Sequence, residues 1–166
     1  MTDAQPVLTA IDLDGLWSAQ PDREHGLDAI AAALFDATDH RGKLLGGDGC
    51  HLLRAWPHQA YLLTQTPTLP ARAEPFSALF TDISDAFRAF RLEGDATIDF
   101  LGDYLSADIR REPPTNHCLR CRFGHYAVVL WWQRRERVQL LVERSLAQSF
   151  EDDIERLMVR RYPEAS

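Results

Sequence analysis

The chain lacks most features of secreted, membrane-embedded and nucleic-acid-binding proteins. Its first residues contain no basic segment followed by an apolar one, so we expect no secretory signal. No stretch approaches the roughly 18 uninterrupted apolar residues of a membrane span. The three cysteines are an odd number and give no disulfide framework, and the formal net charge of −7 argues against a nucleic-acid surface. We therefore expect a cytoplasmic protein that binds neither membrane nor nucleic acid.

The composition is that of an ordinary globular domain. Of the 166 residues, 45% are apolar and 26% are charged, which allows a sizeable core. We expect an N-terminal arm over residues 1–24, with Pro6 and Pro21, and one domain over residues 25–163. The one clear basic cluster, residues 134–137, is interpreted as a solvated hairpin turn in preference to a phosphate site.

Apolar spacing predicts one helix and one hairpin in the first half of the chain. The helix covers residues 26–38, where apolar side chains recur at helical spacing. A glycine-rich segment over residues 42–49 predicts a loop. Residues 50–56 and 60–64 predict the two strands of a hairpin. Prolines interrupt the next segment and leave a short helix at most, near residues 72–79.

The stretch from Phe80 to Leu101 is the most informative part of the sequence. Its apolar residues recur at short spacing up to Gly94 and Asp95, and at helical spacing after them. This pattern predicts a strand, a tight turn, a second strand, a glycine turn and a helix that ends near residue 105. We interpret the stretch as a β-β-α unit of the core.

The rest of the chain predicts three strands and a final helix. The strands cover residues 118–123, 126–133 and 138–142, with natural turns between them. Ser145 is expected to cap the last helix, whose apolar residues fall on one stripe. Antiparallel strands separated by three to four helices predict an α+β fold. The two halves also share a β-β-α rhythm, which suggests a duplicated unit.

Several motifs resemble one protein family. Residues 82–85, Asp-Ile-Ser-Asp, and residues 92–96, Leu-Glu-Gly-Asp-Ala, are similar to a signature of the folate-binding fold of glycine-cleavage T proteins. Residues 53–63, 121–131 and 140–147 are similar, in order and spacing, to motifs of the gamma subunit of heterotetrameric sarcosine oxidase. The chain therefore resembles the sarcosine oxidase gamma subunit family over roughly residues 27–162.

The resemblance implies a ferredoxin-like α+β domain of the T-protein folate-binding type, with antiparallel sheets. It also implies a non-catalytic accessory subunit of a flavoenzyme complex that oxidises sarcosine or a related N-methyl amine. FAD, FMN, NAD and tetrahydrofolate would then lie on larger alpha and beta partner subunits. No cofactor-binding, catalytic or metal-ligating residue is expected on this chain alone.

Two other functions stay open for the same fold. The first is a minimal folate-binding one-carbon transfer protein, although Asp85 stands where the T-protein signature has a histidine. The chain is also far shorter than a T protein. The second is a stand-alone small-ligand or regulatory module. Folate binding by the isolated chain, or a stable monomer without a large partner, would favour one or the other.

Cys118 and Cys121 are the best candidates for metal binding or nucleophilic catalysis. A Cys-x-x-Cys pair can bind one zinc, but a structural site needs four ligands, and His117, His125 or the pair Cys50-His51 would have to complete it. If the segment is a strand, positions three apart point to opposite faces. A catalytic thiol would need one of these histidines as its base. We expect buried, unreactive cysteines.

The acidic residues near the core unit and the tryptophans also have both a possible functional role and a structural one. The acidic residues near the core unit could perform acid–base chemistry, but Asp82 and Ser84 flank a tight turn and are expected to form hydrogen bonds there. Trp131 and Trp132 are neighbours in a strand and cannot fill one core. Either one of them packs against a larger subunit, as Trp17 and Trp56 could, or the strand is buried on both faces. The acidic residues are Asp82, Asp85, Glu93, Asp95 and Asp99.

Overall fold

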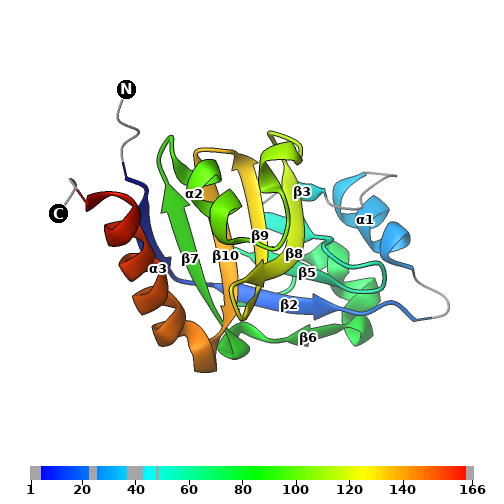
Figure 1. Cartoon of the computed structure of the whole chain (residues 1–166). Coiled ribbons are helices and arrows are strands. Elements are labelled where there is room, and N and C mark those ends of the chain that lie inside the picture. Colours follow the sequence, from blue (N-terminus) through cyan, green and yellow to red (C-terminus); the bar gives the residue numbers. More distant parts are fainter. Residues whose placement is uncertain (1–4, 23–25, 37–42, 48, 164–166) are drawn as a thin grey trace. The chain divides into compact units, whose positions relative to one another are not determined.

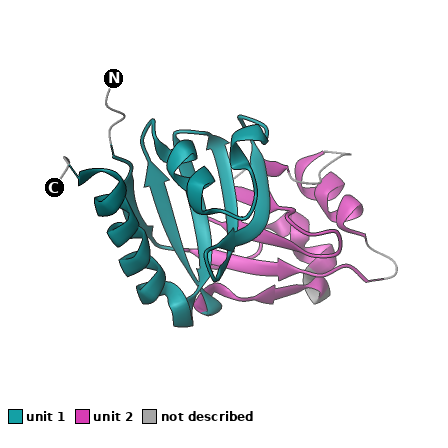
Figure 2. Ribbon diagram, viewed as in Figure 1, with its two compact units in different colours: residues 1–12, 86–166 teal, residues 13–85 magenta. Residues whose placement is uncertain are grey.

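A computed structural model describes residues 5–22, 26–36, 43–47 and 49–163. The described residues form two five-stranded antiparallel sheets and three α-helices (Figure 1). They divide into two compact units, residues 1–12 with 86–166 (unit 1) and residues 13–85 (unit 2), coloured separately in Figure 2. The predicted α+β class with antiparallel sheets is confirmed. None of the described helices is long and apolar enough to cross a membrane.

Unit 1 contains the longer strands and two of the α-helices. Its sheet has the order β1 (Val7–Ile11), β7 (Phe87–Glu93), β10 (Arg137–Glu143), β9 (Tyr126–Arg134) and β8 (His117–Phe123). Its helices are α2 (Thr97–Tyr104) and α3 (Ala147–Arg161), with short 3-10 turns η3 (Ile109–Arg111) and η4 (Arg144–Leu146).

Unit 2 has a smaller sheet and one α-helix. The sheet has the order β3 (Leu44–Gly47), β4 (Cys50–Leu53), β5 (Ala60–Thr64), β2 (Gly15–Ala19) and β6 (Phe80–Asp82). Its helices are α1 (Leu27–Phe35) and the 3-10 helix η1 (Ala71–Leu79), and a 3-10 turn, η2 (Ser84–Ala86), lies where the chain passes to unit 1.

The two sheets have the same topology with their first strands exchanged. In chain order the first half runs β1, β2, α1, β3, β4, β5, η1, and the second half runs β6, β7, α2, β8, β9, β10, α3. The sheet orders β1-β7-β10-β9-β8 and β6-β2-β5-β4-β3 then correspond strand by strand. Strand β1 of the first half is therefore the edge strand of the second-half sheet. Strand β6 of the second half is the edge strand of the first-half sheet. The suggested duplication is confirmed in the topology.

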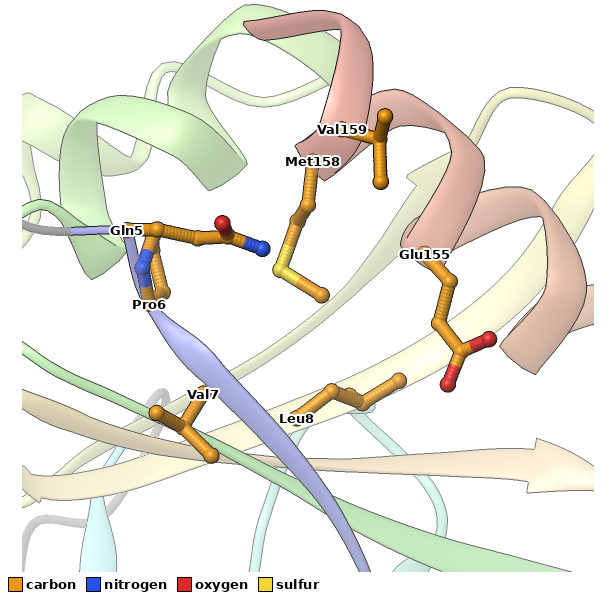
Figure 3. Close-up of a pocket in the computed structure, with 7 residues that line it drawn as sticks. All are labelled: Gln5, Pro6, Val7, Leu8, Glu155, Met158 and Val159. Carbon is orange, nitrogen blue, oxygen red and sulfur yellow. The ribbon is translucent and has the colours of Figure 1, made fainter. Parts of the chain in front are cut away.

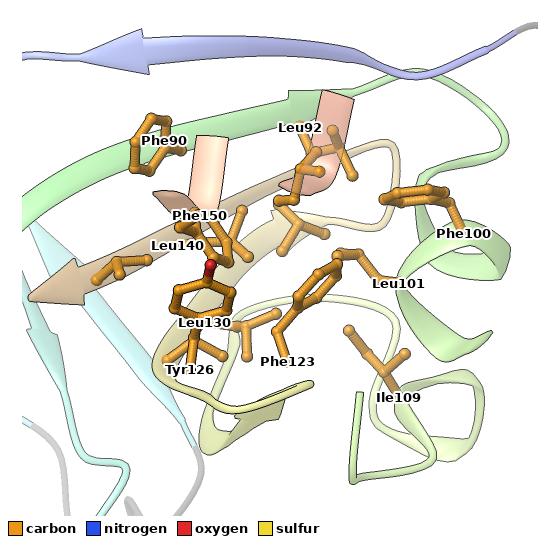
Figure 4. Close-up of a cluster of buried hydrophobic side chains, with 14 of the residues drawn as sticks. Phe90, Leu92, Phe100, Leu101, Ile109, Phe123, Tyr126, Leu130, Leu140 and Phe150 are labelled. Atoms are coloured by element: carbon orange, nitrogen blue, oxygen red, sulfur yellow. The ribbon is translucent and has the colours of Figure 1, made fainter. Parts of the chain in front are cut away.

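The core of unit 1 lies between one face of its sheet and the helices α2 and α3 (Figure 4). Alternate residues of the strands, such as Phe90 and Leu92 or Leu130 and Trp132, point to this face because successive side chains of a strand alternate. Helix α3 contributes one stripe at helical spacing. This stripe consists of Ala147, Phe150, Ile154 and Met158, all buried.

The core of unit 2 is built on the same plan. Helix α1 packs Leu27, Ile30 and Leu34 against β4 and β5 of its sheet. Arg54, 7% exposed, follows β4 and forms an ion pair with Asp28 in the first turn of α1. Because a buried guanidinium needs a partner, this pair fixes the helix to the end of the strand.

The segments expected as an N-terminal arm and a glycine-rich loop contain strands. Strand β1 pairs with β7, β2 lies between β5 and β6, and β3 forms the edge beside β4. These predictions were wrong for residues 7–11, 15–19 and 44–47, since strands of four or five residues show too little alternation to be recognised. Residues 42 and 48 of the expected loop lie outside the described residues.

Two details of the predicted elements also differ. Strands β6 and β7 do not pair with each other, although they are joined only by η2, because β6 pairs with β2 while β7 pairs with β1 and β10. Ser145 is exposed within η4 and forms no cap, and α3 begins at Ala147 after Leu146. The remaining predicted helices and strands agree with the structure to within a few residues.

Candidate functional site

Cys118 and Cys121 lie on opposite faces of β8, as the strand spacing predicts. Cys121 packs against the core of unit 1, whereas Cys118 is fully buried outside that cluster. Burial raises the pKa of the Cys121 thiol to about 12, so this thiol is not activated as a nucleophile. Within the described parts of the chain, no group of three or more His, Cys, Asp or Glu side chains could hold a metal ion.

His117 has a structural role at the start of β8. Its Nε2 donates a 2.9 Å hydrogen bond to the carboxylate of Glu112, and its ring centroid lies 5.1 Å from that of Trp132. Burial lowers the pKa of His117, while Glu112 opposes this shift. The indole of Trp132 donates a 3.0 Å hydrogen bond to the carbonyl of Pro113, so both rings fix the loop before the strand.

Two of the acidic residues near the core unit, Asp82 and Asp99, form hydrogen bonds with different partners. Asp82 accepts hydrogen bonds from the backbone N–H and the hydroxyl of Ser84, at 2.9 Å and 2.7 Å, which lowers the pKa of Asp82. Asp99 binds the Nε of Arg110 at 3.1 Å. The structural interpretation of the turn is confirmed, and Asp82 and Asp99 belong to different units.

The basic cluster forms the β9–β10 hairpin turn, as predicted. Arg137 donates a 2.8 Å hydrogen bond from its Nε to Glu93, and this contact lowers the pKa of Glu93. Arg135 donates from its Nη2 to the carbonyl of Arg110 at 3.0 Å. At least two of the arginines are therefore held by neighbouring loops and strands of unit 1.

Both tryptophans of β9 are buried. Trp131 is 6% exposed and Trp132 is fully buried, so the strand is covered on both faces. The hypothesis that one of them packs against a larger subunit is wrong, and the alternative of a strand buried on both faces is confirmed. Trp56 is half-buried beside Tyr61, with ring centroids 4.7 Å apart, in an open groove of unit 2 of about 490 Å³.

A groove that the sequence analysis did not predict lies in unit 1 between β1 and α3. It has a volume of about 630 Å³ and is lined on the strand side by Gln5 to Leu8 and on the helix side by Glu155, Met158 and Val159. Figure 3 shows Leu8 and Met158 directed into the space between the two elements, with the Glu155 carboxylate at one end.

Two exposed valines belong to the elements that line this groove. Val7 is 62% exposed and Val159 is 53% exposed, and they are two of the three large apolar side chains that are exposed among the described residues. Val159 lies on the helix side of the groove, whereas Val7, next to Leu8 in the strand, points to the other face of the sheet (Figure 3). Exposed apolar side chains on neighbouring elements are typical of interaction sites. We name this set, Gln5 to Leu8 with Glu155, Met158 and Val159, the β1–α3 groove.

At the level of sequence, no protein family and no curated protein matches the chain. One solved structure that it resembles is the heterotetrameric sarcosine oxidase from Corynebacterium sp. U-96 in complex with pyrrole 2-carboxylate. The TM-score is 0.76 at 18% sequence identity, and the match covers 97% of this chain and 86% of that chain. The fold of this protein is therefore similar to that of a chain from a heterotetrameric oxidase.

Proposed function

We propose that this protein is a non-catalytic accessory subunit, of the gamma type, in a flavoenzyme complex that oxidises sarcosine or a related N-methyl amine. The observation that carries the proposal is the match to a sarcosine oxidase chain over nearly the whole of both chains. Because 86% of that chain is covered, it is similar in length to this protein, which favours a small subunit over a domain of a large one.

The chemistry of the described residues supports a role without catalysis. In β8, Cys118 is buried, burial raises the pKa of Cys121, and His117 is paired with Glu112. Three of the carboxylates near the core unit, those of Asp82, Asp99 and Glu93, are held by hydrogen bonds from neighbouring side chains. In our proposal the larger alpha and beta subunits carry FAD, FMN, NAD and tetrahydrofolate. The β1–α3 groove suits none of the dinucleotides, since Glu155 would repel a pyrophosphate. The complex would work in the cytoplasm.

Reconstitution tests the proposal. The larger subunits are prepared without this chain, and sarcosine oxidation is measured before and after the purified chain is added. We expect the chain alone to be inactive and its addition to raise the activity or the thermal stability of the complex. The proposal fails if the chain has no effect on either property. Tight binding of tetrahydrofolate by the chain alone would instead favour the one-carbon transfer function.

A further inference from the structure

Strand β1 is an edge of the unit 1 sheet that carries no protection against pairing. Its sequence, Val-Leu-Thr-Ala-Ile, contains no charged residue, and its side chains are exposed or half-buried. The opposite edge, β8, carries the exposed arginines Arg120 and Arg122. Edge strands are normally protected by charges, bulges or covering elements. The two edges of this sheet therefore differ in their capacity to accept another strand.

The outer side of β1 also has free backbone groups. The strand pairs with β7 on one side only, and at alternate positions its N–H and C=O groups point away from the sheet. No hydrogen bond to these groups comes from the part of the chain that the structure describes. A strand added here would satisfy them and would lie beside the β1–α3 groove.

We propose that an extended segment of a larger partner subunit adds to β1 as an outer strand and fills the β1–α3 groove, an inference that rests on the proposed function. Strand addition of this kind uses main-chain hydrogen bonds for affinity and pockets for alternate side chains for specificity. Side chains of the added strand alternate between the two faces of the sheet. On one face they cover Val7, and on the other they pack against Leu8 and Val159 (Figure 3).

The charges of the groove define the segment further. Glu155 is exposed and has no ion-pair partner among the described residues, and Glu151, one turn earlier on α3, has none either. A lysine or arginine of the partner that lies over α3 would therefore meet two carboxylates. We infer a segment with alternating apolar residues and at least one basic residue.

The same features disfavour a second copy of this chain as the occupant. Two copies that paired through β1 around a two-fold axis would bring two acidic grooves together, each on a chain with a net charge of −7. Like charges that face each other without intervening cations oppose association. The uncharged edge strand and the carboxylates of Glu151 and Glu155 therefore fit a basic, heterologous partner better.

Hydrogen exchange in the assembled complex tests the proposal directly. The probe is the complex of this chain with the flavin-containing subunits that co-purify from its native host, compared with the free chain. We expect the outward N–H groups of residues 7–11 to exchange at least tenfold more slowly in the complex, and those of β8 to remain unchanged. If the complex forms and residues 7–11 exchange equally in both states, the inference is wrong while the proposed function stands.

Charge variants give an independent readout, with a matched control on the same unit. Val7→Lys and Val159→Lys should each weaken binding of the larger subunits at least tenfold. Leu146→Lys, at the third exposed apolar side chain (38% exposed), should change it less than twofold. Glu155→Gln should weaken binding and reduce its salt dependence. Equal effects of all three lysines would overturn the inference, provided that thermal unfolding shows all variants folded.

Two other experimental outcomes would also overturn the inference. If the wild-type chain binds no larger subunit, both the inference and the proposed function fail. If the free chain forms a dimer that protects residues 7–11 and that Val7→Lys dissociates, the occupant is a second copy and the inference is wrong.

Discussion

Replacement of Phe150 by alanine tests whether α3 is held to the sheet by its aromatic contacts. Phe150 is fully buried in the unit 1 core, with ring centroids 5.5 Å from Phe90, 5.4 Å from Phe123 and 5.2 Å from Tyr126. Truncation of a buried phenylalanine costs about 3–5 kcal/mol of unfolding free energy, from lost burial and the cavity left behind. Since three aromatic neighbours lose their partner, we expect about 4 kcal/mol, a large part of a typical total of 5–15 kcal/mol.

Urea unfolding followed by circular dichroism measures this loss. Phe150→Leu keeps most of the apolar volume but loses the aromatic pairs, so it should cost less than Phe150→Ala and more than a substitution at an exposed position. Val159→Ala, at an exposed position of the same helix, should stay within about 0.5 kcal/mol. A loss below about 1.5 kcal/mol for Phe150→Ala would refute the reasoning, because it would mean that α3 does not depend on this contact.

Three further predictions follow from the titration of buried groups. Burial and a hydrogen bond raise the pKa of Tyr126 to about 12, so the folded state keeps a proton that the unfolded chain loses from about pH 10. Between pH 10 and 12 the wild type should lose roughly 1–2 kcal/mol of stability relative to Tyr126→Phe, and equal pH profiles would contradict this. The pKa of His117, measured by NMR, should lie below 6.5, so the contribution of this residue to stability is present above pH 6.5 and is lost as the pH falls. Glu112→Gln should lower the pKa of His117 further. A pKa of His117 at or above 6.5 in the wild type would contradict the burial argument. The pKa of Cys121, about 12, predicts alkylation by iodoacetamide at least about 100-fold slower than that of free cysteine, and equal rates would show that the thiol is accessible and ionised.

The parts of the fold that could be predicted are those with local signals. Strands β8, β9 and β10 have seven to nine residues with turns at Gly124 and at the basic cluster between them. Helix α3 has an apolar stripe at helical spacing from Ala147 to Met158. Gly124 adopts a φ of +56°, in the left-handed region that glycine accepts without strain, which explains why the turn was evident.

The parts that could not be predicted depend on contacts between distant segments. Nothing near β6 and β7 indicates that each pairs with a strand of the other half, because exchange of first strands leaves no local pattern. Strand β3 forms a hairpin with the adjacent β4, but its sequence, Leu-Leu-Gly-Gly, shows no alternation typical of a strand. The short strands β1 and β2 pair with strands far along the chain. For the same reason the β1–α3 groove was missed, since its two walls lie about 150 residues apart. The one local sign was a short apolar stretch without charge, at residues 7–11.

The two tryptophans of β9 show a different limit. Alternation along a strand correctly placed Trp131 and Trp132 on opposite faces, but it does not say whether each face is covered. Both are buried, so the strand needs no partner to cover either of them. Solvent exposure of side chains can be read only from the structure, and it identifies Val7 and Val159 as candidates for contact with a partner.

The most direct test of the central claim is the mass and absorbance of the complex that a tagged copy of this chain brings down from its native host. Our account predicts an assembly with larger chains that carries a flavin absorbance band and oxidises sarcosine or a related N-methyl amine. A colourless chain recovered alone, under conditions that preserve other hetero-oligomers of the host, would contradict it.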